Sequence, residues 1–565
     1  MPTRTRATVT SLGLVTGAVG LVAATLGAPA GAAPATTAAP SRGASAAGGG
    51  AAAPVPTAAY APTTCWPSIP AEVVTKRRIR CGYVTVPLRH ERPSAGSIQL
   101  AAAVVPATGP RRRPDPVVLL SGGPGQGAVA LAMSFVESWN SSSGYGALNV
   151  DRDLVFLDQR GTGYSRPALG CEPYADTTTP DGGLGNCFKA LSKKTDLNAF
   201  TTTQNSADLD RARRALGYGQ VNLYGVSYGS KLGYQTLRGT PSWVRSAALA
   251  SPIAARPNWV ENAPRTYQES LNSVYRSCAA QTSCRRSWGD LKAKLDQVTA
   301  RLEKKPLVVP ISPDRAGRPR SVTVTAESLS TLVFQGLYSS IGVAVTPALI
   351  GTLAEGDHTM LSSLLDEPAG DGTAPDPGTL ISEGMYMSVV CAEEVAHGTL
   401  AGVRAAAKGT QRLVHKHFAG AQIESLWKLC KVWKVERAST AFTKPVASKT
   451  PTLVVSGAFD PITPPSYGTA MARSLPRSQK VTLQAYAHSP LEDAAGCANS
   501  ILEPFVNAPT TRFQAPCASA SPHLFTRADL GRPSTSAEKL GQRAQQQRER
   551  SFDADPFLHR HLLTD

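Results

Sequence analysis

Short apolar runs with helical stretches between them make up the first and the last parts of the chain. The runs show little polar alternation, which is typical of strands buried on both faces of a sheet. The first two predict an antiparallel hairpin, and the others predict an α/β fold with a mostly parallel central sheet flanked by helices. The predicted strands cover residues 83–87, 99–105, 117–120, 154–157, 221–226, 246–250, 452–456 and 481–485.

The middle of the chain has a different pattern. Residues 257–439 are helical in character with little strand signal, and the strand rhythm returns after residue 440. The sequence therefore predicts one sheet domain, formed by residues 63–256 and 440–517, which an inserted helical domain interrupts. A polar C-terminal tail, 518–565, follows. A chain of 565 residues is long enough to bury a large core and to hold more than one domain.

The N-terminus has the features of a secretory signal peptide. Arg4 and Arg6 precede an apolar stretch over residues 12–26, and small residues suitable for cleavage follow it. The alternative is a transmembrane anchor, for which the stretch is too short and too rich in glycine. We therefore expect residues 1–32 to be a signal peptide, the protein to be secreted, and no stable membrane insertion. Residues 33–62 consist almost wholly of Ala, Pro, Thr, Gly and Ser, which predicts a disordered tether.

The chain is basic, with 58 Lys and Arg against 41 Asp and Glu and a net charge of +17. The basic residues are scattered and only 6% of the residues are aromatic, so no stretch combines basic and aromatic side chains as nucleic-acid-binding proteins do. We expect no nucleic-acid partner. A diffuse positive surface suits anionic envelopes or acidic peptides.

Ten cysteines in a chain that is expected to be exported predict disulfide bonds. Their clustering suggests that neighbours pair, although the count alone allows many other pairings. No pair of cysteines has the spacing of a zinc finger, and we expect no metal or organic cofactor. The suggested pairs are Cys65 with Cys81, Cys171 with Cys187, Cys278 with Cys284, Cys391 with Cys430, and Cys497 with Cys517.

The most informative motif is Gly225-Val226-Ser227-Tyr228-Gly229, which follows a predicted strand and precedes a predicted helix. Flanking glycines at such a position let the backbone turn sharply, and the turn lifts the serine hydroxyl above the end of the sheet. The alternative is a purely structural turn. Because strand, turn and helix occur in the order that a nucleophile elbow requires, we expect Ser227 to be a catalytic nucleophile.

A glycine-rich loop follows the predicted strand 117–120. Its sequence, Ser121-Gly122-Gly123-Pro124-Gly125-Gln126-Gly127, allows the backbone to approach a substrate carbonyl and to direct amides at a developing oxyanion. In enzymes with a nucleophile elbow, a second amide comes from the residue after the nucleophile. We therefore expect the backbone N–H groups of Gly123 and Tyr228 to form the oxyanion hole. The alternative is an ordinary strand–helix connection.

A serine nucleophile needs a general base and a carboxylate that orients it. Asp460 comes just after the predicted strand 452–456, and His488 follows the next predicted strand by three residues. One turn–helix–strand return between them would place both at the sheet edge where Ser227 lies. His488 could instead be a bystander on the surface. His415 and His417, in the helical insertion, could form a metal pair, but a solvated helix face is the simpler interpretation.

Four motifs in this order resemble the secreted tripeptidyl aminopeptidase and proline iminopeptidase family of α/β-hydrolases, and the resemblance runs from about residue 65 to residue 517. It implies an α/β-hydrolase fold with the helical insertion as a lid. It also implies removal of amino acids or short peptides from free N-termini, with Ser227 as nucleophile, Asp460 as orienting acid and His488 as base. The motifs are Ser-Gly-Gly-Pro-Gly, Asp-Gln-Arg-Gly-Thr-Gly-Tyr-Ser, Gly-Val-Ser-Tyr-Gly and Ser-Gly-Ala-Phe-Asp-Pro-Ile-Thr-Pro.

An aminopeptidase must also recognise the ammonium group of its peptide substrate, and a carboxylate of the lid would do so economically. Similar enzymes carry an acid just after a cysteine such as Cys391, which makes Glu393 and Glu394 the candidates for substrate binding. The alternative is a pair of solvated acids at a helix end. Two other functions remain: a secreted carboxylesterase or lipase that uses the same residues on an ester, and a non-catalytic envelope-binding protein with a hydrolase shape.

Overall fold

The computed structural model describes the chain from residue 59 to residue 530, apart from residues 133–143, 177, 180, 314–317, 367–379, 420 and 494. The expected signal peptide, most of the expected tether and the last part of the tail lie outside the described residues.

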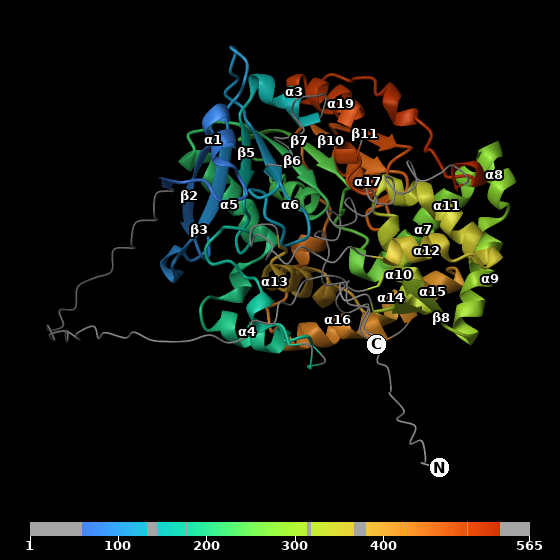
Figure 1. Ribbon diagram of the computed structural model, residues 1–565. Helices are drawn as coiled ribbons and strands as arrows, with labels where there is room; N and C mark the ends of the chain where they lie inside the picture. Colours follow the sequence, from blue (N-terminus) through green and yellow to red (C-terminus); the bar gives the residue numbers. More distant parts are fainter. Residues whose placement is uncertain are drawn as a thin grey trace, which may run out of the picture.

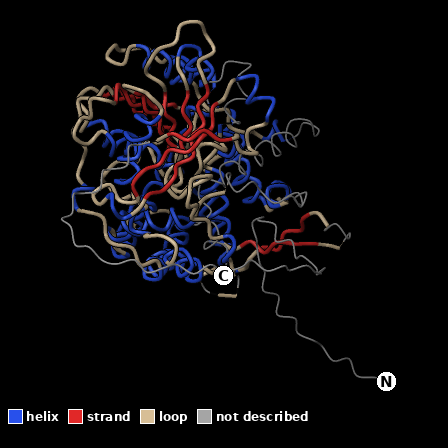
Figure 2. The backbone as a smooth tube through the Cα atoms, turned by 90° about the vertical axis from the view of Figure 1, so that its left-hand side faces the viewer, coloured by secondary structure: helices blue, strands red, loops and turns tan. Residues whose placement is uncertain are grey.

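A nine-stranded sheet forms the centre of the sheet domain (Figures 1 and 2). Its strand order is β1-β2-β3-β5-β4-β6-β7-β10-β11. The strands from β5 to β11 run parallel, whereas β1, β2 and β3 extend one edge in antiparallel pairing. The strands are β1 (Tyr60–Thr63), β2 (Arg80–Pro87), β3 (Ser97–Val105), β4 (Val117–Leu120), β5 (Leu154–Leu157), β6 (Val221–Val226), β7 (Val244–Ala250), β10 (Thr452–Gly457) and β11 (Ser478–Leu483).

Helices cover both faces of this sheet, which explains why its central strands are apolar on both sides. Leu223 and Tyr224, adjacent on β6, are both buried and belong to the cores on opposite faces. α3 (Gly144–Asp151) and α19 (Ala495–Asn507) supply apolar side chains to the core on one face. α5 (Thr202–Ala215), α6 (Tyr228–Thr236) and α17 (Pro465–Arg473) supply them to the core on the other. Further helices of this part are α1 (Ala71–Arg77), α4 (Leu184–Ser192), α18 (Pro490–Asp493) and α20 (Arg527–Leu530).

The segment between β7 and β10 is the helical insertion, which lies beside the sheet domain (Figure 1). Its buried side chains form one core together with Tyr228 and Phe459, so the insertion packs directly on the loops at the end of the sheet. Its helices are α7 (Trp259–Ala280), α8 (Thr282–Trp288), α9 (Leu291–Lys304), α10 (Ala326–Gly336), α11 (Ser340–Glu355), α12 (Thr359–Leu365), α13 (Glu383–Glu393), α14 (Leu400–Ala407), α15 (Arg412–Ala419) and α16 (Ala421–Val432).

The insertion also contains a β-hairpin that the sequence pattern did not predict. β8 (Leu307–Ile311) and β9 (Arg320–Val324) pair antiparallel as a separate two-stranded sheet, which stands apart from the main sheet in Figure 2. Val309 is buried and Val308 is 62% exposed, so the strand has one inner and one outer face. Pro310 obscures the strand pattern but is tolerated because both strands are edge strands.

Ordered structure extends into both the predicted tether and the predicted polar tail. The chain becomes regular before the predicted end of the tether at residue 62, because Tyr60–Thr63 pair with β2. At the other end, Leu524 and Phe525 of the predicted polar tail are buried. The Phe525 N–H donates to the Ala344 carbonyl at 2.9 Å, and Trp288 Nε1 donates to the Phe525 carbonyl at 2.6 Å. The start of the tail therefore packs on the insertion.

The ten cysteines form the five neighbouring pairs that their clustering suggests, and the described part of the chain has no free cysteine. Cys65–Cys81 fixes the segment just after β1, and Cys391–Cys430 joins α13 to α16. Among the described residues, the helices are too short or too polar to span a membrane.

Candidate active site

The three predicted catalytic residues lie at the carboxyl edge of four adjacent strands. Ser227 directly follows β6, Asp460 comes after β10 and His488 after β11. These strands are parallel neighbours in the order β6-β7-β10-β11, so their carboxyl ends lie at one edge of the sheet. The Ser227 N–H donates to the Ala250 carbonyl of β7, and the Ser489 N–H, next to His488, donates to Ser251 Oγ after the same strand. Hydrogen bonds to β7 thus hold the serine and histidine loops on either side of one strand.

Ser227 occupies a backbone conformation that suits an elbow. Its φ is 57° and its ψ is −122°, a region that residues with a side chain rarely adopt. The flanking glycines are required by close backbone contacts. A Cβ on Gly225 would lie 2.3 Å from the Gly229 carbonyl oxygen, and a Cβ on Gly229 would lie 1.9 Å from the Leu120 carbonyl oxygen. The Gly-x-Ser-x-Gly spacing is therefore what lets strand, turn and helix pack this tightly.

The glycine-rich loop after β4 passes directly beside Ser227. A Cβ on Gly122 would lie 3.3 Å from Ser227 Cβ, and Gly123 follows with a φ of 99°. Ser121 Oγ donates to the Gln126 carbonyl at 2.6 Å, and Gln159 Nε2 donates to the Ser121 carbonyl at 2.9 Å. The loop is thus braced in a fixed shape, with Gly122 next to the elbow and Gly123 directly after it. Tyr228, the other predicted donor, is the first residue of α6.

His488 and Asp460 form a buried acid–base pair. His488 Nδ1 lies 2.8 Å from Asp460 Oδ2, with the histidine 6% exposed and the aspartate fully buried. The aspartate is held in turn by its own loop. Asp460 Oδ1 accepts the backbone N–H groups of Ile462 and Thr463 at 2.9 and 2.7 Å, and Oδ2 accepts the Thr463 hydroxyl at 2.5 Å. The carboxylate is therefore fixed toward Nδ1, and Nε2 is the ring nitrogen that does not face Asp460.

The pKa of Asp460 lies below its ordinary value of 3.8. Burial alone would raise the pKa of this carboxyl, but the charge and hydrogen bond of His488 and the donors of Thr463 outweigh burial. Asp460 is consequently ionised at neutral pH. A charged, immobile carboxylate stabilises an imidazolium, which is the state that a general base reaches after accepting a proton.

The insertion touches three loops around this site: the glycine-rich loop, the loop after β5 and the loop that carries His488. At the start of α13, the Ser382 N–H donates to the Gly125 carbonyl at 3.0 Å and Ser382 Oγ donates to the Gly161 carbonyl at 2.6 Å. After α10, the Tyr338 carbonyl accepts the His488 N–H at 3.1 Å, and the two rings lie 5.1 Å apart. Sequence reasoning missed Ser382 and Tyr338, because nothing local distinguishes them from other residues of the insertion.

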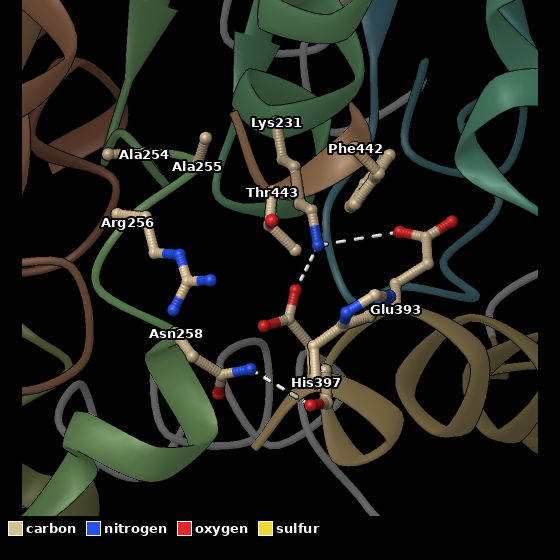
Figure 3. A pocket seen from close by; sticks show the side chains of 10 residues that line it. Lys231, Ala254, Ala255, Arg256, Asn258, Glu393, His397, Phe442 and Thr443 are labelled. Carbon is tan, nitrogen blue, oxygen red and sulfur yellow. Dashed lines mark hydrogen bonds and ion pairs between the residues drawn. The ribbon is translucent and has the colours of Figure 1, made fainter. Parts of the chain in front are cut away.

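The structure places Glu393 and Glu394 at the end of α13, where both are buried and both pair with Lys231 of α6. Figure 3 shows Glu393 and Lys231 facing each other. Lys231 Nζ lies 3.4 Å from Glu393 Oε2 and forms a closer ion pair with Glu394. Glu393 also accepts the backbone N–H and the hydroxyl of Thr202 at 2.7 and 2.8 Å. Neither acid is the solvated helix-end residue of the alternative interpretation.

These charges lie at a small pocket lined by Lys231, Glu393 and Glu394, together with Ala254, Ala255, Arg256, Asn258, His397, Phe442 and Thr443. Asn258 Nδ2 donates to the Glu394 carbonyl at 2.9 Å, and the Lys231 ammonium lies 4.6 Å from the centre of the Phe442 ring. Sequence analysis did not single out Lys231. Its signal is a lone lysine on a helix whose every residue is buried, since a buried lysine needs a charged partner.

Comparisons with known proteins agree with this geometry. Residues 115–360 match the family model described as alpha/beta hydrolase fold, and residues 416–516 match the one described as TAP-like protein. The serine protease Hip1 of Mycobacterium tuberculosis is 25% identical over 469 residues, covering 76% of this chain and 85% of Hip1.

Two further relatives differ in the activity that their names give. A tripeptidyl aminopeptidase of Streptomyces coelicolor is 30% identical over 214 residues, or 33% of this chain and 38% of that protein. Carboxylesterase B of Mycobacterium tuberculosis is 26% identical over 471 residues, or 78% of this chain and 87% of that protein. From the fold and the matches to both models, the chain belongs to the α/β-hydrolases as a serine hydrolase with a TAP-like C-terminal part.

Proposed function

We propose that this protein is an exported serine exopeptidase that releases amino acids or short peptides from free N-termini through an acyl-enzyme. The observation that carries the proposal is the buried Asp460–His488 pair at the same sheet edge as the strained Ser227 elbow, beneath an insertion that contacts both loops. Two of the relatives are named as peptidases, and one of these as a tripeptidyl aminopeptidase.

In the proposed mechanism, His488 takes the proton of Ser227 Oγ as the oxygen attacks the scissile carbonyl. Asp460 holds the imidazole in the correct tautomer and stabilises its positive charge. The backbone N–H groups of Gly123 and Tyr228 bind the oxyanion, and each such donor accounts for about 10²–10³ in rate. His488 then gives its proton to the leaving amine, and water activated by the same histidine hydrolyses the acyl-enzyme.

The preference for a free N-terminus would come from the lid. A substrate ammonium two or three residues before the scissile bond lies up to about 10 Å from the attacked carbon. The glutamates lie against Lys231, which follows Ser227 by one helical turn, or about 6 Å along the axis of α6. Two carboxylates share the single Lys231 ammonium, and we retain Glu394 as the acid that pairs with the substrate amine. Glu393 is more fully engaged, because Thr202 donates twice to it.

A carboxylesterase is the second candidate. Its support is the internal pairing of both lid acids with Lys231, together with the extended similarity to carboxylesterase B. An ester substrate needs no ammonium site and uses the same nucleophile, base and oxyanion hole.

A substrate panel separates the two candidates. Purified protein is assayed on aminoacyl, dipeptidyl and tripeptidyl anilides, each with a free and an acetylated amine, and on short-chain nitrophenyl esters. We expect turnover of free-amine peptides that is lost on acetylation, with the preferred length reporting the reach of the lid. Ester turnover without any peptide turnover would establish the esterase instead.

The control is Ser227→Ala, which should lower kcat by at least about 10³-fold on every accepted substrate while leaving the melting temperature close to that of the wild type. Residual activity near that of the wild type would overturn Ser227 as the nucleophile.

Export is part of the proposal. The N-terminal pattern supports a signal peptide, and five disulfides suit an oxidising compartment outside the cytoplasm. Mass spectrometry of the protein secreted by an expressing cell should find a mature N-terminus near residue 33.

A further inference from the structure

A buried chain of hydrogen bonds connects the residue after the nucleophile to the lid. The Tyr228 hydroxyl lies 2.8 Å from Thr202 Oγ1, and Thr202 Oγ1 lies 2.8 Å from Glu393 Oε2. Because an ionised carboxylate only accepts, the threonine hydroxyl donates to Glu393 and accepts from Tyr228. Glu393 then pairs with Lys231, so this series of polar contacts ends on α6, the helix that also carries Tyr228. The lid helix α13 therefore holds α6 at two points of its first turn, at Tyr228 and at Lys231.

Burial makes this arrangement strong. Tyr228, Thr202, Glu393 and Lys231 are each at most 3% exposed. Burial by itself would lower the pKa of Lys231, but the two glutamates outweigh it and raise that pKa, so the ammonium remains charged. Removal of one partner from such a network leaves a buried polar group unsatisfied, which costs more than the loss of an exposed pair.

The network bears on catalysis through the position of Tyr228. In the proposed function, its backbone N–H binds the oxyanion, and a donor of this kind must lie within a few tenths of an ångström of its target. The side chain of Tyr228 is fixed by its hydrogen bond to Thr202, the first residue of α5. The backbone N–H of Thr202 also donates to Glu393. The end of α13 is held in turn by the Cys391–Cys430 disulfide.

We propose that Thr202, Glu393 and Lys231 are positioning residues, which hold the Tyr228 backbone N–H where it can bind the oxyanion. Because Glu393 belongs to the lid helix α13, this half of the oxyanion hole then forms only when the lid is packed against α5 and α6. The inference rests on the proposed serine-hydrolase function. It gives Glu393 a role that does not require contact with the substrate.

The first test compares Thr202→Val, which loses the hydroxyl at nearly constant volume, with Thr202→Ser, which keeps it. The substrate is a nitrophenyl ester without any amine, so that recognition of an ammonium cannot contribute. We expect Thr202→Val to lower kcat by roughly 10-fold with little change in KM, and Thr202→Ser to restore most of it. Tyr228→Phe should cause a similar loss, and the double variant Thr202→Val/Tyr228→Phe no further loss, because both changes break the same hydrogen bond.

A matched control lies on the same helix. Tyr234 is buried like Tyr228, and its hydroxyl is also hydrogen-bonded, to Ser474 and Val446, at the far end of α6. Tyr234→Phe should change stability without changing kcat on the ester. A second readout is the affinity for a boronic acid inhibitor, whose adduct with the serine occupies the oxyanion hole. That affinity should fall in Tyr228→Phe by the same factor as kcat/KM and stay unchanged in Tyr234→Phe.

Glu393→Gln decides between positioning and substrate binding. As a positioning residue, Glu393 should affect kcat equally on the ester and on a free-amine peptide. A rise in KM confined to free-amine peptides would assign it to the ammonium instead and overturn the inference. Wild-type kcat on the ester in both Thr202→Val and Tyr228→Phe would overturn it as well, even though Ser227→Ala is inactive. If Thr202→Val does not fold, Tyr228→Phe, which removes a single oxygen, carries the same test.

Discussion

Asp460 is the residue whose charge the proposed mechanism depends on most directly. In Asp460→Asn the side chain keeps its shape, and its oxygen can still accept the N–H groups of Ile462 and Thr463. The amide that replaces Oδ2 donates, however, and favours the wrong tautomer of His488. We expect kcat to fall by about 10⁴-fold with a nearly unchanged melting temperature. A fall of less than about 10-fold in steady-state kinetics would show that this carboxylate does not orient the base.

His417 gives the protein a pH-dependent stability. It is fully buried among Tyr267, Phe334 and Phe418, and burial lowers its pKa to about 4. The unfolded chain binds a proton at this residue near pH 6.5 and the folded chain only near pH 4. Stability is therefore lost as the pH falls through this window, by about 3 kcal/mol in total.

The measurement compares the unfolding free energy of the wild type and His417→Leu from pH 7.5 to pH 4. As the pH falls, the unfolding free energy of His417→Leu should rise relative to that of the wild type. His415→Leu, at an exposed position on the same helix, should show no such trend. Asp158, whose buried carboxyl has a pKa of about 7, titrates in the opposite sense but is present in every variant and cancels. A difference that does not depend on pH would contradict the assignment.

At the scale of residues, the sequence predicts positions that strand order determines and misses those that depend on distant packing. Ser227 and Asp460 follow recognisable buried strands, His488 follows the partly buried edge strand β11, and parallel strands bring their carboxyl ends to one edge. The pairing of Glu393 and Glu394 with Lys231 joins residues more than 160 positions apart through a lid whose packing has no local pattern. For the same reason, the expected solvated face at His417 is wrong: the side chain packs inward against α7 and α10.

At the scale of elements, strands buried on both faces were predictable because a short, continuous apolar run in an α/β chain is typical of a central parallel strand. The hairpin of β8 and β9 was not, because its strands are short, one-sided and interrupted by Pro310. β1 lies in a composition typical of a tether, and its four residues are ordered by pairing with β2 and by the nearby Cys65–Cys81 disulfide.

The disulfides differ in how much chain they restrain. Cys391–Cys430 has a sequence separation of 39 residues and joins two lid helices, whereas Cys278–Cys284 has a separation of 6. The entropy that a crosslink removes from the unfolded chain corresponds to roughly 4 kcal/mol for the longer loop and roughly 2 kcal/mol for the shorter. Replacing both cysteines of each pair by alanine should therefore lower the melting temperature more for 391/430 than for 278/284 in thermal unfolding. Equal shifts would show that local packing, and not chain restraint, dominates.

At the scale of the whole molecule, the insertion is joined to the sheet domain by its two covalent connections and also by several non-covalent contacts. The insertion binds the glycine-rich loop through Ser382, the histidine loop through Tyr338 and the nucleophile helix through Glu393 and Glu394. The sequence indicates that a helical insertion exists because the helical pattern interrupts the succession of strands. It does not indicate how the insertion is attached, since each attachment pairs residues from separate parts of the chain.

The start of the tail is one such attachment. After Cys517, which is tied to Cys497 of the sheet domain, the chain crosses to the insertion and buries Leu524 and Phe525 there. Phe525 bonds to Ala344 and Trp288 through its backbone, and Arg527 pairs with Glu355 and lies 4.9 Å from the centre of the Trp288 ring. Residues 518–530 therefore form a strap, a segment that connects α8 and α11 of the insertion to the end of the sheet domain.

Loss of the Phe525 side chain should weaken this strap without touching the active site. Phe525→Ala is expected to cost about 3 kcal/mol, as for a buried aromatic ring that leaves a cavity. The loss should appear as faster proteolysis within the insertion and a lower melting temperature, while kcat at a low assay temperature stays near that of the wild type. His523→Ala is the matched control, because that side chain is 73% exposed only two residues away. If Phe525→Ala is cleaved no faster than His523→Ala, the tail does not stabilise the insertion, and the contacts with the loops at the end of the sheet are sufficient to hold it.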